Sequence, residues 1–294
     1  MKELIRKIII INFVNKFLIQ PLRYIKFLLP FKYLSRLPVI GEFTYKRKKG
    51  KSFKFASNGY DPTANLLFWS KGKDYESHFF NLLNSHFKNA GILFDVGANT
   101  GVVSIQLALL PNALNVYAFE PLPRAYNALQ NNLKLNEIKN CHTYQLALSD
   151  SIRESTLYVP NVEAIPTSSS LRADFCPDHS KIKISITTLD EFVQTKNIKK
   201  IDLVKIDVEG GELGVLKGMK STLEKIKPHI ICEILPRTGD LEKTSKFLIR
   251  FGYFVYEILE NEIKPILKIE DYKRTECIDF LFSPSEMINL SVEK

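Results

Sequence analysis

From residue 91 onward, short runs of β-branched and aromatic residues alternate with longer segments of helical periodicity. The apolar runs cover residues 92–96, 115–119, 141–147, 201–206 and 229–234, and the helical segments cover residues 102–110, 122–135, 210–224 and 241–251. This alternation predicts an α/β domain in which a mostly parallel sheet carries helices on both faces. The runs 253–259 and 276–282 predict two further strands, and residues 148–188 predict an inserted hairpin with a Ser- and Pro-rich loop.

The chain of 294 residues has a net charge of +9, and the first fifty residues hold the whole of that excess. They contain twelve Lys and Arg against two Glu, a net charge of +10, whereas residues 51–294 carry a net charge of −1. A domain that binds nucleic acid would show its own basic surface, so we expect no nucleic-acid partner. We divide the chain into a basic, apolar segment, residues 1–50, and a predicted domain, residues 51–294.

Residues 4–40 are rich in Ile, Leu and Phe, but charged residues interrupt each apolar run before it reaches the ~18 residues of a membrane-spanning helix. The apolar stretch 8–14 is short for a secretion signal, and no small-residue cleavage site follows it. Two interpretations stay open. The segment suits an anchor at an anionic membrane surface, and it also suits a helical cap packed on the domain. The first predicts a cytoplasmic protein at the inner face of the membrane, and the wide spacing of the four cysteines also favours a reducing compartment.

The segment from Asp95 to Gly101, after the first predicted strand of the alternating pattern, predicts a ligand-binding loop. Gly97 and Gly101 let the backbone turn tightly and approach a ligand, and the helix starting near Val102 presents free N–H groups. Glu120 follows the next strand, nineteen residues past Gly101. Because a carboxylate at this place can accept hydrogen bonds from both ribose hydroxyls, we expect a cofactor that contains a nucleoside.

The residues of this loop favour S-adenosylmethionine over NAD. The loop lacks the G-x-G-x-x-G spacing with which dinucleotide-binding proteins approach a diphosphate. Asp95 adds a negative charge, which disfavours a diphosphate and favours a cationic or zwitterionic ligand. The amino-acid end of S-adenosylmethionine is such a ligand.

Three charged residues, Lys205, Asp207 and Glu209, follow one another at period two near the end of the predicted strand 201–206. Period two places them on one side of a strand in the centre of the sheet, where both faces should be apolar. Desolvating a charge is costly unless it pairs or reaches a ligand, so we take these three as candidate catalytic residues. Residues 168–170 and Glu233 are expected at the same edge and complete a predicted acceptor pocket.

At these residues the sequence resembles the FkbM family of S-adenosylmethionine-dependent methyltransferases. The resemblance rests on FDVGANTG (94–101), AFEP (118–121), ALSD (147–150), TTLDEF (187–192), LVKIDVEGGE (203–212) and CEI (232–234), in the family's order across residues 75–260. It implies a Rossmann-like class I methyltransferase fold with seven strands, the last of them antiparallel. The activity it implies is O-methylation of small molecules or glycans. Residues 1–50 lie outside the resemblance.

The resemblance also implies roles for individual residues. The methionine-side loop would contain Asp95, Gly97, Asn99 and Gly101, the ribose ligand would be Glu120, and the adenine edge would run from Ala147 to Asp150. Gly211 departs from the family pattern, which has alanine there, and Pro236-Arg237 stands where a histidine is frequent. The second departure leaves the base on the acceptor side open.

A base is needed because a sugar hydroxyl is a poor nucleophile at neutral pH. Asp207 and Glu209 are the candidate bases, and Lys205 is expected to orient them or the acceptor. Binding of Mg²⁺ by the oxygens of Asp207, Glu209, Glu212 and Glu233 is a further hypothesis, which carboxylates alone do not establish. Two alternative functions are RNA methylation, which only the basic segment supports, and a methyltransferase-like binding module without activity. The five histidines show no ligand spacing, and we expect them on the surface or in the core.

Overall fold

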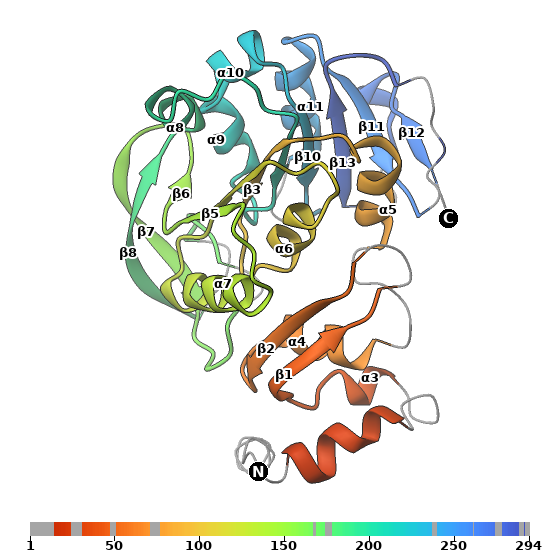
Figure 1. Ribbon diagram of the computed structural model, residues 1–294. Helices are drawn as coiled ribbons and strands as arrows, with labels where there is room; N and C mark the ends of the chain where they lie inside the picture. Colours follow the sequence, from red (N-terminus) through yellow and green to blue (C-terminus); the bar gives the residue numbers. More distant parts are fainter. Residues whose placement is uncertain are drawn as a thin grey trace.

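The computed structural model of the chain has a large central sheet at its core (Figure 1). It describes residues 15–24, 31–47, 51–70, 77–166, 169–173, 178–236, 240–260, 262–273, 278–287 and 291. The central sheet has eight strands in the order β12-β11-β13-β10-β9-β3-β4-β5. Their bounds are β3 (Ile92–Val96), β4 (Asn115–Phe119), β5 (Cys141–Tyr144), β9 (Leu203–Ile206), β10 (His229–Glu233), β11 (Phe254–Ile258), β12 (Ile263–Pro265) and β13 (Asp279–Ser283).

The fold class expected from the sequence is confirmed. Strands β5, β4, β3, β9 and β10 pair in parallel. The last strand, β13, runs antiparallel between β10 and β11, as the resemblance implies. The sheet has one strand more than expected, because the short β12 pairs with β11 at the edge. The chain moves outward from β3 to β5 and then returns to β9 on the other side of β3, so the strand order reverses between β3 and β9. Ligands of open α/β sheets bind at such an edge.

Helices cover both faces of the central sheet (Figure 1). One face packs against α8 (Leu189–Thr195), α9 (Glu212–Lys217), α10 (Lys220–Lys225) and α11 (Leu241–Ile249). The other face packs against α5 (Ser77–His86) and α6 (Val102–Ala108), and α7 (Pro123–Leu135) joins α6 in a neighbouring core. Phe94 and Val204 enter the first core, whereas Leu93 and Leu203 enter the second. Burial on both faces explains why the strands are continuous apolar runs and do not alternate with polar residues.

A smaller sheet, in the order β6-β8-β7, contains the inserted hairpin that the sequence predicts. Its strands are β6 (Ala147–Leu148), β7 (Arg153–Pro160) and β8 (His179–Thr187). Because β7 and β8 pair antiparallel along the length of β7, the predicted hairpin is confirmed. The strand predicted over 141–147 is divided in the structure: β5 stays in the central sheet, while β6 pairs in parallel with β8.

The helix predicted over residues 210–224 is also divided, into α9 and α10. The break falls at Gly218 and Met219. A Cβ atom on Gly218 would lie 1.9 Å from the carbonyl oxygen of Ser149. The backbone that follows β6 therefore occupies the space that a side chain at residue 218 would need.

An N-terminal hairpin, formed by β1 (Ile40–Tyr45) and β2 (Phe53–Asn58), packs on α4 (Pro62–Trp69). The ring of Phe43 on β1 lies edge-on to the ring of Phe68 on α4, with 5.2 Å between the ring centroids. The boundary expected at residue 50 falls between the two paired strands. Residues 40–45 therefore belong with the elements that follow them, because a strand and its hairpin partner share one set of hydrogen bonds.

The elements η1 (Asn15–Ile19), η2 (Gln20–Tyr24) and α3 (Phe31–Leu34) precede this hairpin. Leu34 and Val39 are buried in the core that α4 and the hairpin share. The Trp69 indole donates a hydrogen bond to the carbonyl oxygen of Leu37 at 3.0 Å. Residues 1–14, 25–30 and 48–50 of the basic, apolar segment lie outside the described residues. In the part of the chain that is described, no helix is both long enough and apolar enough to cross a bilayer.

Candidate active site

A cavity opens at the carboxyl ends of β3, β4 and β9, where the strand order reverses. Its lining comes from these strand ends, from α7, from the segment around β6 and β7, and from the loop that leads to β8. The described residues that line it are Val96, Gly97, Asn99, Phe119, Glu120, Pro121, Leu122, Ala125, Leu146, Ala147, Leu148, Leu157, Pro166, Ser169, Leu171, Asp207, Val208, Glu209 and Gly211. The predicted site residues in this set are Gly97, Asn99, Glu120, Ala147, Leu148, Ser169, Asp207 and Glu209.

Gly97 has a φ of 88°, and a Cβ atom there would lie 1.8 Å from the carbonyl oxygen of Asp207. Only glycine adopts this conformation without cost and also leaves room for the neighbouring backbone. The amide of Asp207 donates to the carbonyl oxygen of Val96 at 2.9 Å. The loop after β3 and the loop after β9 are therefore in direct backbone contact, and Gly97 serves that contact as well as the cavity.

The carboxylate of Asp95 points to α6 and not into the cavity-lining loop after β3. Asp95 is buried within β3, and its Oδ2 accepts a hydrogen bond from the hydroxyl of Ser104 on α6. Burial raises the pKa of Asp95 to about 6, against the lowering effects of Ser104 and Lys205. Asp95 and Gly101, both predicted for the methionine-side loop, are not among the described residues that line the cavity.

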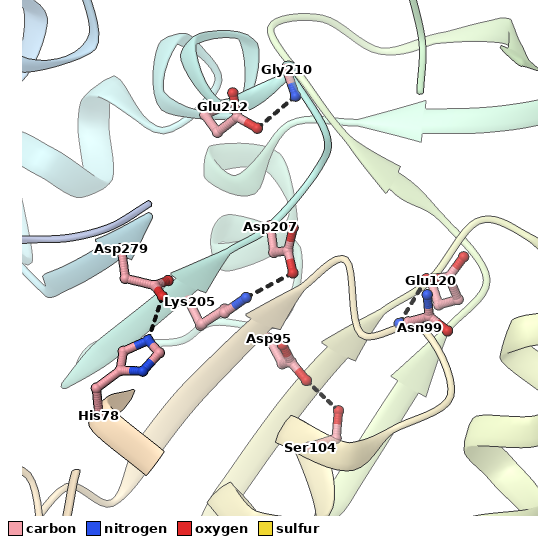
Figure 2. Close-up of polar contacts among 10 residues, drawn as sticks. All are labelled: His78, Asp95, Asn99, Ser104, Glu120, Lys205, Asp207, Gly210, Glu212 and Asp279. Atoms are coloured by element: carbon pink, nitrogen blue, oxygen red, sulfur yellow. Dashed lines mark hydrogen bonds and ion pairs between the residues drawn. The ribbon is translucent and has the colours of Figure 1, made fainter. Parts of the chain in front are cut away.

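Glu120 holds the loop after β3 through its side chain. Its Oε2 accepts from the amide of Asn99, and its Oε1 accepts from the amide of Leu122, both at 2.8 Å. Figure 2 shows the hydrogen bond between Asn99 and Glu120. Burial raises the pKa of Glu120 to about 7, although both hydrogen bonds lower it. Each carboxylate oxygen has a second lone pair, so Glu120 can accept a further hydrogen bond from a ligand in the cavity.

The predicted adenine edge is only partly at the cavity. Ala147 lines it together with Leu148 and Leu157, which gives this end of the cavity an apolar wall. Asp150 is not among the described lining residues, and its Oδ1 accepts a hydrogen bond from Arg153 at 2.8 Å on the surface. This contact lowers the pKa of Asp150.

Lys205 is fully buried on β9, directly opposite Asp95 on β3 in the register of the sheet. Its Nζ lies 2.9 Å from Oδ2 of Asp207 (Figure 2). Asp207 is partly accessible and lines the cavity, whereas Lys205 is not among the described residues that do so. The buried ammonium group of Lys205 therefore holds the carboxylate of Asp207 in place at the cavity wall.

Glu209 combines three unusual features. Its φ of 52° lies in the left-handed region that non-glycine residues rarely adopt. Its Oε2 is buried and has no hydrogen-bond partner among the described residues. Burial and the neighbouring charge of Asp207 raise its pKa to about 8. Backbone strain and an unsatisfied polar atom in a residue that lines a cavity indicate a contact with a ligand.

The loop that leads to β8 reaches the same place. The hydroxyl of Ser170 donates to the carbonyl oxygen of Glu209 at 2.9 Å, and Ser169 lines the cavity. The amide side chain of Asn99 donates to the carbonyl oxygen of Pro166 at 3.2 Å. The expectation that residues 168–170 converge on this edge is therefore met by Ser169 and Ser170. Ser168 and Arg237 lie outside the described residues.

The magnesium hypothesis finds no support. Among the described residues, no group of three or more His, Cys, Asp and Glu side chains is arranged to hold a metal ion. The Oε1 of Glu212 accepts from the amide of Gly210 at 2.7 Å, and Asp207 pairs with Lys205. These two carboxylates therefore already have partners within the protein.

One contact at this edge has no counterpart in the sequence analysis. The Nε2 of His78, on α5, lies 2.6 Å from Oδ2 of Asp279 on β13 (Figure 2). Asp279 pairs with Glu233 of β10 in the antiparallel register. His78 and Asp279 are 201 positions apart, so no local pattern could have revealed this pair.

A second missed residue is Asn132, which is buried on α7. Its Nδ2 donates to the carbonyl oxygen of Thr100, and its Oδ1 accepts from the amide of Ala56, at 2.9 and 3.0 Å. Asn132 thus links the N-terminal hairpin to the loop after β3. The only signal in the sequence was a polar residue on the apolar side of a predicted helix.

A family model described as "Methyltransferase FkbM domain" matches residues 95–259, more than half of the chain. The chain is 29% identical over 163 residues to hexuronic acid methyltransferase AglP of Haloferax volcanii, with 54% of this chain and 62% of that protein covered. It is 25% identical over 198 residues to 31-O-demethyl-FK506 methyltransferase FkbM of Streptomyces tacrolimicus, with 56% and 73% covered. The crystal structure of methyltransferase FkbM of Methylobacillus flagellatus is similar over 69% of this chain and 47% of that chain, with 16% identity and a TM-score of 0.46.

Proposed function

The chain belongs to the FkbM methyltransferase family, and we propose that it transfers a methyl group from S-adenosylmethionine to a hydroxyl oxygen of a saccharide or a related small molecule. Two relatives support this choice of acceptor: one is named for a hexuronic acid, and the other for 31-O-demethyl-FK506. The observation that carries the proposal is the carboxyl group of Glu209, which lines the cavity with a buried, unpartnered oxygen.

The residues around the cavity fit S-adenosylmethionine. Glu120 has lone pairs to offer the ribose hydroxyls, and Ala147, Leu148 and Leu157 form an apolar wall for the adenine. The unpartnered oxygen of Glu209 suits the cationic, amino-acid part of the molecule. When bound, S-adenosylmethionine supplies a methyl group that is activated by a positively charged sulfur.

The protein has two tasks in this reaction: to align the acceptor, and to remove its hydroxyl proton. We assign the second task to the carboxylate of Asp207, which lines the cavity and is fixed by Lys205. We assign Glu209 to the cationic cofactor and not to this proton transfer, because its buried Oε2 has no hydrogen-bond partner among the described residues. The contact between Gly97 and the backbone of Asp207 serves alignment, because it fixes the base relative to the loop after β3.

Two measurements test the proposal. Titration calorimetry should detect binding of S-adenosylmethionine and of S-adenosylhomocysteine, but not of NAD. Mass spectrometry of surface glycans, from cells with and without the protein, should show a loss of methyl groups from the glycans of the deficient cells. Binding of NAD in place of S-adenosylmethionine would overturn the cofactor, and unchanged glycans would overturn the saccharide acceptor.

A further inference from the structure

The described part of the N-terminal segment has one side fixed to the domain. Asn15 is buried, its Nδ2 donates to the carbonyl oxygen of Pro38 at 2.6 Å, and its Oδ1 accepts from the amide of Ile40 at 2.9 Å. The side-chain Nε2 of Gln20 donates to the carbonyl oxygen of Ile40, also at 2.6 Å. Because residues 38–40 lead directly into β1, these contacts attach η1 and η2 to the N-terminal hairpin.

The same segment also exposes large apolar groups. The exposed fractions are 57% for Phe17, 62% for Leu18, 77% for Tyr24 and 63% for Tyr33. These four residues lie within seventeen positions of one another, on η1, η2 and α3. The other described large apolar residues with high exposure are spread over positions 114–267: Leu114, Ile152, Val162, Ile249, Phe254 and Leu267.

Exposed apolar residues that occur singly are normal on a soluble protein, whereas a concentration of them marks an interaction surface. Here the concentration lies on elements that Figure 1 shows together at the N-terminal end, away from the central sheet. The cavity is at the carboxyl ends of β3, β4 and β9, so catalysis does not account for these exposed side chains.

Charge indicates what binds there. Lys16 on η1 and Arg36, two residues after the end of α3, are also exposed, and the Nζ of Lys16 lies 5.8 Å from the centroid of the Phe17 ring. Residues 1–50 carry a net charge of +10, while the rest of the chain carries −1. A partner that meets both the apolar and the cationic groups has an apolar interior beneath a negatively charged surface, which describes a bilayer with anionic lipid.

We propose that this N-terminal face docks on the surface of a membrane that contains anionic lipid, without crossing it. The N-terminal face is defined by Lys16, Phe17, Leu18, Tyr24, Tyr33 and Arg36. The apolar side chains enter the headgroup region, and the cations meet the lipid phosphates. The internal contacts of Asn15 and Gln20 keep this face in a fixed orientation on the domain. The sequence presents membrane docking and packing on the domain as alternatives, and in this proposal one segment does both through different residues.

Flotation of the full chain with lipid vesicles tests the proposal. The protein should bind vesicles of phosphatidylcholine with phosphatidylglycerol, bind weakly to phosphatidylcholine alone, and lose affinity as salt screens the charges. The double variant Phe17→Glu/Leu18→Glu should lower vesicle binding by about tenfold or more, because it removes apolar groups and adds negative charge at the face. Both residues are exposed, so the fold should be unaffected.

The matched control is Ile152→Glu/Leu267→Glu, which makes the same change of charge at exposed apolar residues elsewhere. It should bind vesicles like the wild type. Equal vesicle binding by the two double variants would overturn the proposal. So would wild-type protein that binds phosphatidylcholine vesicles equally well with and without phosphatidylglycerol. The protein could instead bind single-stranded RNA in competition with vesicles. If only the Phe17/Leu18 variant lost this RNA binding, the N-terminal face would be a nucleic-acid surface and the proposal would be overturned. The vesicle assay needs no methyl donor, so its outcome is independent of the proposed reaction.

Discussion

Gly97 and Asp207 touch through their backbones: a Cβ atom at Gly97 would lie 1.8 Å from the carbonyl oxygen of Asp207. Gly97 follows β3 and Asp207 follows β9, which are neighbouring strands on either side of the point where the strand order reverses. The loop predicted to bind the cofactor and the residue proposed as the base therefore share one contact. A change in either one moves the other.

Gly97→Ala should impair both cofactor affinity and turnover, because the new methyl group collides with the Asp207 backbone. Gly252→Ala is the matched control: its φ is 83° against 88° for Gly97, but a Cβ there meets nothing within 4 Å. The control should show only the cost of backbone strain, on the order of 1 kcal/mol of unfolding free energy. Calorimetry and thermal unfolding of both variants separate the two effects, and similar cofactor affinities would contradict the prediction.

Asp207→Asn should lower turnover by roughly 10²- to 10⁴-fold, the usual contribution of a general base. Cofactor affinity should change little, because the variant keeps the shape of the side chain and the backbone contact to Gly97. Methyl transfer and cofactor binding are measured on the same preparation. Wild-type turnover in this variant would exclude Asp207 as the base, and a large loss of cofactor affinity would assign it to the cofactor instead.

Glu120→Gln should weaken cofactor binding. Both carboxylate oxygens accept from backbone amides, at Asn99 and Leu122, and the variant turns an NH₂ group toward one of these donors. Loss of one such charge-assisted bond costs about 1.5–3 kcal/mol. Asp150→Asn is the control, since Asp150 pairs with Arg153 on the surface. Calorimetry measures the cofactor affinity of both variants. An equal loss of affinity would show that Asp150 contributes to cofactor binding, as predicted for the adenine edge.

Cofactor binding should release protons through Glu209. The raised pKa, about 8, means that this carboxyl group is protonated at neutral pH in the free protein. A cationic sulfonium nucleoside stabilises the carboxylate form, so affinity should increase as the pH rises toward 8 and protons should be released on binding below that pH.

Calorimetry in buffers of different ionisation enthalpy measures this release. The Glu209→Gln variant isolates the contribution of Glu209 from that of Glu120, whose pKa is raised to about 7, and from that of the ligand's own amino group. Equal proton release by the variant and the wild type would show that Glu209 does not respond to the cofactor.

Asn132→Leu should lower both stability and cofactor affinity. The change leaves the carbonyl oxygen of Thr100 and the amide of Ala56 without their buried partner, at about 1–3 kcal/mol of unfolding free energy for each. Asn136→Ala is the control, because the side-chain hydrogen bonds of Asn136 to the described residues go to the backbone of Lys54 in the same hairpin and to the carbonyl oxygen of Asn132. Urea unfolding should show a smaller loss for the control, and its cofactor affinity should remain that of the wild type.

The strands of the central sheet could be predicted because burial on both faces makes each of them an apolar run of limited length. The division of the helix over residues 210–224 could not, because its cause is the approach of Ser149 to Gly218 from a distant part of the chain. The sequence also did not show that the run 141–147 leaves the central sheet at β6, because β6 pairs with β8, a strand far along the chain.

The sequence predicted which loops meet at the site more reliably than which side chains face the cavity. Glu120, Asp207 and Glu209 line it, because Glu120 and Asp207 follow directly on the ends of parallel strands and Glu209 lies three residues past the end of β9. Asp95 lies within its strand, and the register directs its carboxylate to α6 and Ser104. The pair His78 and Asp279 depends on the packing of α5 against β13, which no local pattern encodes.

The hairpin β1–β2 decides how this chain can be shortened. A cut at residue 50 would leave β2 without the strand that pairs with it, and would uncover Phe53 and Phe55 on an open edge. Such edges recruit strands from other molecules, so the shortened protein should aggregate. After removal of the first fifty residues, a change in sedimentation with membranes could come from aggregation or from loss of the membrane-binding residues. Point substitutions in the full chain distinguish the two causes.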